Sequence, residues 1–214
     1  MNRKHIVLKT FTAADLAESD SEKADSTVIL SGGFSGNGHL FLLEKWSKQG
    51  SESTEILREV IRHMRFYQSS GGFIEKNRFE SIMRTCRKLV KAGFYGDTVQ
   101  VNKIINRIKQ IPHYGVSKMD RFRDTIGQYS RSKMIWMRKD WNDVRDFFIN
   151  YPAVDHDDIG DCIDMLIEYG SAPSKNFIQI SKREGSDNPR EYQPEDVNAY
   201  FAKKKVNIYT GVAK

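Results

Sequence analysis

The sequence predicts an α/β protein built on a mixed β-sheet with helices on both faces. Three observations favour this class. The N-terminal quarter contains three apolar, strand-like runs, and Gly36-Asn37-Gly38 joins the second to the third in a pattern typical of a tight hairpin. Amphipathic helices and short strand-like runs then alternate, which is the arrangement that covers both faces of a sheet. Hydrophobic residues make up 39% of the 214 residues, enough for a substantial core.

The three N-terminal runs are rich in aliphatic and β-branched residues. They cover residues 5–14, 26–34 and 39–46. The polar and acidic segment 16–24 separates the first run from the second, and the Asn-Gly turn separates the second from the third. We therefore expect three antiparallel strands at the start of the chain.

Apolar residues then recur at intervals of three and four positions, as they do along one face of a helix. Helices are predicted over residues 51–68, 78–91, 118–129, 141–148 and 156–169. In the first, Ile56, Val60 and Met64 mark the apolar face, and Gly71-Gly72 ends the helix. Short strands are predicted over residues 72–75, 97–101 and 133–136, and residues 103–114 fit neither pattern.

The predicted order is three strands followed by alternating helices and strands, and it is the element order of the RNase H-like fold. We expect a mixed sheet of five to six strands in which the first strand neighbours the fourth. Ligand crevices of such sheets lie at the carboxyl ends of neighbouring strands. Asp15 follows the first predicted strand and Glu75 ends the fourth, so both are expected at this crevice.

The composition divides the chain and excludes several classes. Residues 1–172 are predicted to form one globular domain, and residues 173–214 a basic, loosely structured tail rich in Pro and polar residues. The net charge of +6 permits a polyanionic partner but does not establish one. No apolar run approaches the roughly 18 residues that span a bilayer. Two cysteines without a CxxC motif favour neither a disulfide framework nor a zinc site.

Acidic residues occur at three places where apolar elements begin or end. They are Asp15, Glu75 and the group Asp157, Asp158 and Asp161 at the start of the last helix. Each taken alone is typical of a loop, a surface position or a helix start, where acids complement the helix dipole. Together at one crevice they would repel each other, and divalent cations relieve such repulsion. Carboxylate oxygens suit Mg²⁺ or Mn²⁺, and two ions about 4 Å apart can promote phosphodiester hydrolysis.

Five segments resemble, in order, motifs of the nuclease domain of large terminase subunits, the DNA-packaging proteins of tailed double-stranded DNA phages. They are residues 12–27, 38–46, 73–77, 117–122 and 151–161. The last contains His156-Asp157-Asp158-x-x-Asp161 after an aromatic-Pro pair, and the resemblance extends over about residues 5–170. One departure is Cys162, where the family usually has Ala.

The resemblance implies that Asp15, Glu75 and Asp158 are the catalytic residues and the main ligands of two Mg²⁺ or Mn²⁺ ions. Members of the family differ in the acid of the third motif that binds metal, so further candidates remain open. These candidates are Asp157, Asp161 and, for the second ion or its water, Asp25.

The resemblance also implies that Lys118 and Arg121 contact the phosphodiester backbone, although a solvated helix face is a nearly equal alternative. The implied function is a metal-dependent endonuclease that cuts concatemeric viral DNA during packaging in the host cell cytoplasm. Its implied partners are double-stranded DNA, the portal protein, the small terminase subunit and the ATPase motor.

The motor itself is not expected in this sequence. Residues 32–38 are rich in glycine but lack the Lys-Ser/Thr ending of a phosphate-binding loop, so ATP hydrolysis is not predicted. The sequence is compatible with an excised nuclease domain or a separately encoded nuclease subunit. Two other functions stay open: another RNase H-like nuclease such as a Holliday-junction resolvase, and a non-catalytic module that binds DNA or the portal.

Overall fold

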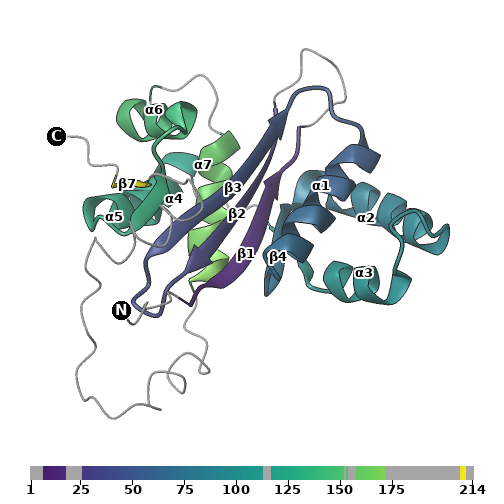
Figure 1. Cartoon of the computed structure of the whole chain (residues 1–214). Helices are drawn as coiled ribbons and strands as arrows, with labels where there is room; N and C mark the ends of the chain where they lie inside the picture. The colour runs from purple at the N-terminus through teal and green to yellow at the C-terminus, as the bar shows by residue number, and fades with distance from the viewer. Residues whose placement is uncertain are drawn as a thin grey trace, which may run out of the picture.

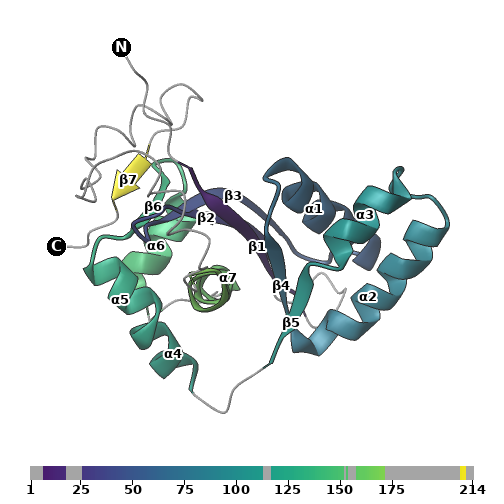
Figure 2. The same ribbon diagram turned by 90° about the horizontal axis from the view of Figure 1, so that it is seen from below.

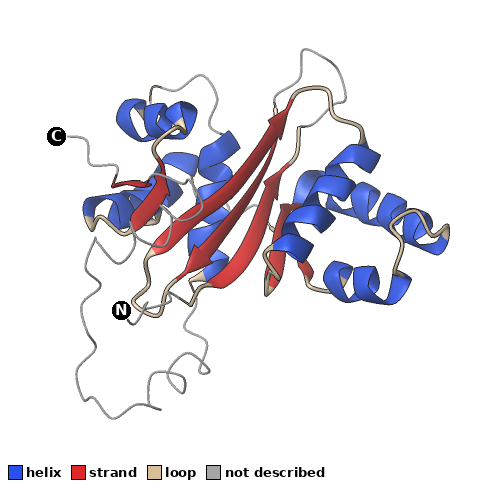
Figure 3. Ribbon diagram, viewed as in Figure 1, coloured by secondary structure: helices blue, strands red, loops and turns tan. Residues whose placement is uncertain are grey.

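The structure is a computed structural model that describes residues 7–17, 26–112, 117–151, 153, 158–171 and 208–210. Its strands are β1 (Lys9–Asp15), β2 (Thr27–Phe34), β3 (Leu40–Lys48), β4 (Gly71–Glu75), β5 (Ile108–Ile111), β6 (Ile135–Arg138) and β7 (Ile208–Thr210). Its helices are α1 (Ser53–Phe66), α2 (Lys76–Lys91), α3 (Thr98–Ile105), α4 (Lys118–Asp124), α5 (Ile126–Arg131), α6 (Asn142–Asn150) and α7 (Asp158–Met165), which continues into a π-helical turn, Leu166–Gly170. Figure 3 shows how strands and helices are distributed.

The strands form one mixed sheet in the order β5-β4-β1-β2-β3-β6-β7. β1, β2 and β3 are an antiparallel meander, whereas β4 is parallel to β1 and β5 is parallel to β4. On the other side, β6 is parallel to β3 and β7 is antiparallel to β6. The order β5-β4-β1-β2-β3 with these directions is that of the RNase H-like fold, so the predicted fold class is confirmed.

Helices cover both faces of the sheet (Figures 1 and 2). The helices α1, α2 and α3 cover one face, and one core cluster packs Ala14, Ile29 and Ile74 against them. The helices α4 to α7 cover the other face, where a second cluster includes Ala13, Val28, Leu30 and Phe73. Because successive side chains of a strand alternate between these clusters, the face of each strand residue follows from its register.

The structure corrects one predicted strand. Residues 97–101 form the start of helix α3, because the Asp97 side chain caps the helix by accepting a hydrogen bond from the Gln100 amide at 3.1 Å. Val101, Ile104 and Ile105 are then buried at helical spacing. The fifth strand is β5, within the stretch that fits neither pattern in the sequence.

Two predicted helices also differ in detail. The helix predicted over residues 118–129 is divided at Thr125 into α4 and α5, because Thr125 has a non-helical backbone with φ −106° and ψ −82°. The last predicted helix changes from α to π at Leu166.

The tail contributes a strand. β7 pairs with the edge of β6, so three residues of the segment predicted to be loosely structured belong to the sheet, which has seven strands instead of five or six. The rest of residues 173–214 lies outside the described part of the chain. None of the described helices is long and apolar enough to cross a membrane.

Candidate active site

Asp15 and Glu75 end two adjacent parallel strands. β1 and β4 are in register up to the pair Ala14–Ile74, so the next residue on each strand brings Asp15 beside Glu75. Ala14 and Ile74 face α1–α3. Since side chains alternate, Asp15 and Glu75 are placed on the opposite face, under α7. The predicted neighbourhood of these two acids at the carboxyl ends of the strands is therefore present in the structure.

Helix α7 carries further acids to the same end of the sheet. It packs against β1 and β2, with Asp158 as its first residue and Asp161 one turn later. Asp161 is only 6% exposed. Gly160 between them allows the neighbouring helices to approach closely, because a Cβ there would lie 2.5 Å from Phe147 Cζ and 2.7 Å from Phe122 Cε2.

The thiol of Cys162 ties α7 to the strand ends. It is completely buried, and its Sγ donates a hydrogen bond to the Val28 carbonyl at 3.4 Å. Burial raises the pKa of this thiol well above its ordinary value. Sequence reasoning noted Cys162 only as a departure from a family pattern and missed this role.

The pKa of the Asp15 carboxyl group reflects the negative charges of the neighbouring carboxylates. This pKa is raised from an ordinary 3.8 to about 8, and burial is the largest cause. The negative charges of Glu75, Asp161 and Asp158 add to the rise, in that order, while Lys118 acts in the opposite direction. Three carboxylates from β4 and α7 therefore lie near enough to Asp15 to disfavour its ionisation.

Helix α4 supplies positive charge to α7. Lys118 Nζ lies 2.5 Å from Asp161 Oδ2, and Arg121 Nη2 lies 3.6 Å from Asp161 Oδ1. Both residues were predicted to contact the DNA backbone. The structure places them at the acidic site, where they form ion pairs with α7.

Asp164 is a buried member of this network that sequence reasoning missed. Its side chain is 1% exposed, and Arg121 Nη1 lies 2.9 Å from its Oδ2. The Thr125 hydroxyl donates a hydrogen bond to its other oxygen. Burial raises the pKa of Asp164, while Thr125 and Arg121 oppose the rise. The available signal was the three-residue spacing of Asp158, Asp161 and Asp164, which places them on adjacent turns.

The donor set fits a hard divalent cation, because every candidate ligand is a carboxylate. The crowding around Asp15 is also what a cation would relieve. Among the residues that the structure describes, however, no three His, Cys, Asp or Glu side chains form a group already spaced as metal ligands. Asp25 and Asp157, the other predicted ligands, lie outside the described residues, so their positions stay predictions.

A second polar network lies on the opposite face of β1 and β2. Thr12 Oγ1 lies 3.2 Å from Ser31 Oγ and 3.0 Å from Ser69 Oγ, and Ser31 Oγ lies 2.8 Å from His63 Nδ1. His63 is fully buried, and within the described residues its Nε2 atom has no hydrogen-bond partner. Burial lowers the pKa of His63 to about 4. The network joins α1 to the sheet.

Neither a scan of protein families nor a search of curated proteins finds a match for this chain. Among solved structures, the fold is similar to the resolvase of Fowlpox virus in complex with substrate Holliday junction DNA. The alignment covers 81% of this chain and 99% of the resolvase, with 14% sequence identity and a TM-score of 0.36. So distant a likeness assigns no activity, and the fold class rests on the strand order and directions.

Proposed function

We propose that this chain is a metal-dependent endonuclease that hydrolyses phosphodiester bonds of DNA. The observation that carries the proposal is the placement of Asp15 beside Glu75 at the carboxyl ends of parallel strands. Asp158 and Asp161 of α7 lie close enough to raise the pKa of Asp15. A gathering of like charges at partly buried strand ends is costly, and a role in binding cations explains it.

Asp15, Glu75 and Asp158 would hold the cations. Two Mg²⁺ or Mn²⁺ ions, when bound, supply an activated water and stabilise the leaving 3′ oxygen. The choice of Asp158 follows the resemblance of residues 151–161 to the third acidic motif of large terminase subunits, and Asp161, which pairs with Lys118 and Arg121, remains a further candidate ligand. Asp157 and Asp25 remain further candidate ligands in the proposal.

Lys118 and Arg121 have a double role in this proposal. Their positive charges lie beside the carboxylates and limit the repulsion among them. Arg121 is also held by buried Asp164, which fixes its orientation. A DNA phosphate that entered the site would meet these two cations, so they would position the backbone without reading its sequence.

The biological role that we propose is cutting of concatemeric viral DNA during genome packaging. The support is the order of five sequence segments that resemble large terminase subunits, from residues 12–27 to residues 151–161. In that role the chain would act in the host cell cytoplasm on double-stranded DNA. Its protein partners would be the portal protein, the small terminase subunit and the ATPase motor.

Cleavage of supercoiled plasmid with Mn²⁺ tests the hydrolytic activity. Asp15→Asn should slow cleavage by more than the roughly 10- to 100-fold loss typical of outer-shell metal partners. The matched control is Asp146→Asn, because Asp146 is exposed on α6 and pairs only loosely with Arg145 at 3.7 Å. Equal cleavage by the wild type and Asp15→Asn would reject the proposal.

A comparison of DNA substrates distinguishes the packaging role from the resolution of DNA junctions. The packaging role predicts cleavage of linear duplex with little dependence on sequence or branching. A marked preference for a four-way junction over the matched linear duplex would instead identify a resolvase. Binding of DNA without cleavage under any divalent cation would identify a non-catalytic module.

A further inference from the structure

The positive charge of the chain is concentrated in one segment. Residues 76–110 contain nine Lys and Arg against two Asp and Glu, a net charge of +7. The whole chain has a net charge of +6, so the other residues, with 25 basic and 26 acidic, total −1. This segment contains α2, α3 and most of β5, the edge strand of the sheet (Figure 2).

Helix α2 presents much of this charge on its outer face. Its apolar residues, which include Ile82, Met83 and Cys86, pack into the core beneath α1–α3. At about 100° per residue, the exposed basic residues of α2 fall within an arc of about 120° on the other side. They are Lys76, Arg84, Arg87, Lys88 and Lys91, and we call this surface the basic face. Glu80 is the single acid of the helix.

The charges of the basic face are not neutralised by neighbours. Within the described part of the chain, Arg84, Arg87, Lys88 and Lys91 form no ion pair. The contrast is α4, where Lys118, Arg121 and Arg123 each pair with an aspartate. A row of unpaired cations on a rigid helix produces the positive field that attracts a polyanion.

Helix stability does not account for this pattern. Lys88 and Lys91 in the last turn complement the helix dipole, but Lys76 lies at the other end, where a cation is unfavourable. The first turn of α2 contains no acid to offset it. The basic residues are therefore distributed over the whole exposed face of α2 and are not confined to the C-terminal turn that the helix dipole favours.

We propose that the basic face binds the phosphate backbone of duplex DNA outside the cleavage site. The inference rests on the proposed function, because α2 begins at Lys76, directly after Glu75. The 16 residues of α2 extend about 24 Å from this point, the length of roughly seven base pairs. Duplex DNA with one phosphate at Glu75 and its neighbours would continue along the helix and contact it by charge alone.

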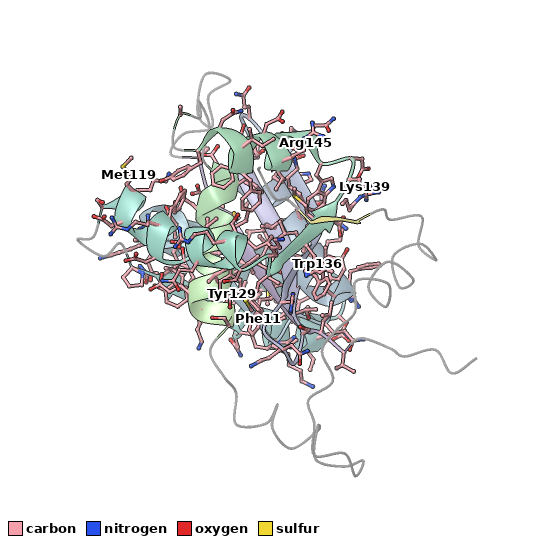
Figure 4. All side chains as sticks on the ribbon, turned by 90° about the vertical axis from the view of Figure 1, so that its left-hand side faces the viewer. Phe11, Met119, Tyr129, Trp136, Lys139 and Arg145 are labelled. Atoms are coloured by element: carbon pink, nitrogen blue, oxygen red, sulfur yellow. The ribbon has the colours of Figure 1, made fainter. Side chains whose placement is uncertain are left out.

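Binding without metal tests this inference separately from cleavage. Fluorescence anisotropy with a labelled duplex of about 30 base pairs, in EDTA, gives the affinity as a function of KCl concentration. The test variant is the triple substitution Arg84→Gln, Arg87→Gln, Lys91→Gln. The matched control is Arg131→Gln, Lys133→Gln, Lys139→Gln, which removes the same charge from exposed positions on α5 and on either side of β6. Figure 4 labels Lys139, which follows β6.

The test variant should flatten the slope of log K against log [KCl] by about 2 to 3, because each lost phosphate contact removes about 0.9. Its affinity should fall roughly tenfold or more at about 100 mM KCl, while the control changes less than about twofold. An unchanged slope in the test variant, or equal weakening in the control, would overturn the inference. Tighter binding of a matched RNA duplex through the same residues would overturn the choice of DNA.

The two proposals can fail independently. If the wild type cleaves plasmid but the test variant binds duplex DNA as tightly as the wild type, only the DNA-binding role of the basic face is rejected. If the wild type binds duplex DNA through the basic face but cleaves no DNA with Mn²⁺, only the hydrolytic activity is rejected. Circular dichroism of both triple variants verifies folding, and exposed positions are expected to tolerate the changes.

Discussion

The pKa of Asp15 is affected by most of the charged residues of the candidate site. Its pKa is raised by burial and by the negative charges of Glu75, Asp161 and Asp158, and the positive charge of Lys118 opposes the rise. The metal-free site therefore contains an unfavourable gathering of negative charge. A protein that maintains such a cluster without a cation sacrifices stability at that point.

Neutralising Asp15 should therefore stabilise the protein in EDTA. Asp15→Asn removes one of the repelling charges, and its Tm at about pH 8.5 should rise by a few degrees, since about 1 kcal/mol shifts Tm by roughly 2–4 °C at this size. The Tm increase that Mn²⁺ gives the wild type should disappear. Differential scanning calorimetry with and without Mn²⁺ measures both effects. An Mn²⁺ shift that survives in Asp15→Asn while Asp146→Asn behaves like the wild type would contradict the assignment.

Asp164 holds Arg121 and Thr125 from a fully buried position. Asp164→Asn leaves Arg121 without its nearest counter-charge, so the free energy of unfolding should fall by about 3 kcal/mol, the low end for a buried pair, because Asp161 still lies 3.6 Å from Arg121. Urea denaturation measures this loss. The double variant Asp164→Asn, Arg121→Met should recover part of it, because no unpaired charge then remains near the core. Additive losses in the double variant would show that the two residues do not act together.

At the scale of single elements, the contact of α7 with its neighbours depends on Gly160. Helix propensity alone favours Gly160→Ala by up to about 1 kcal/mol. The new Cβ would meet the rings of Phe147 and Phe122, however, and both rings are buried. We expect a net loss of about 1–3 kcal/mol from overpacking. A variant more stable than the wild type in urea would show that α7 packs less tightly here.

Helix α1 is joined to the sheet by buried His63, and this link should depend on pH. The pKa of His63 is lowered to about 4 by burial, whereas in the unfolded chain it has its ordinary value near 6.5. Between these values the unfolded state binds more protons, so this contribution to stability rises with pH. It is complete above about pH 6.5 and is lost as pH falls toward 4.

His63→Asn removes the titrating group while keeping a polar atom near Ser31. Stability of the wild type, relative to this variant, should decrease as pH is lowered from 7 to about 4.5. Urea midpoints at several pH values measure the difference. Parallel pH profiles for the two proteins would show that His63 does not contribute to the dependence.

The strands of the meander and the first two acids could be predicted from the sequence. Apolar runs and the Asn-Gly turn located β1 to β4, and β1 and β4 bring Asp15 beside Glu75 in the confirmed fold. Helix α3 was missed because Val99 and Val101 alternate as in a strand, while the Asp97 cap that starts the helix was overlooked. β5 contains only four residues, two of them polar, which is too short a pattern to recognise.

The ionic partners of α7 could not be predicted, because they depend on how α4 packs across it. Lys118 and Arg121 are basic residues on a short helix, and no local pattern shows that they pair with Asp161 and Asp164. The concentration of charge on α2 was visible in the sequence. The whole-chain net charge of +6 hides it, because acidic and basic residues nearly balance over the rest of the chain.

At the scale of the whole molecule, the acidic region and the basic region lie next to each other. They meet at the carboxyl end of β4, where Glu75 ends the strand and α2 begins. The carboxylates of β1, β4 and α7 form the candidate metal site, and the basic face of α2 begins next to Glu75. This arrangement would let one duplex contact both regions, with hydrolysis at the first and phosphate binding along the second. The division explains how a protein of only moderate net charge could hold DNA firmly at one place.

The most direct test of the account is a crystal of this protein soaked in Mn²⁺ and measured for anomalous scattering. The account predicts one or two strong peaks between the carboxyl end of β1 and the start of α7, with ligands from Asp15, Glu75 and Asp158. Anomalous peaks elsewhere, or a well-ordered site with these three side chains and no manganese at millimolar concentration, would contradict it.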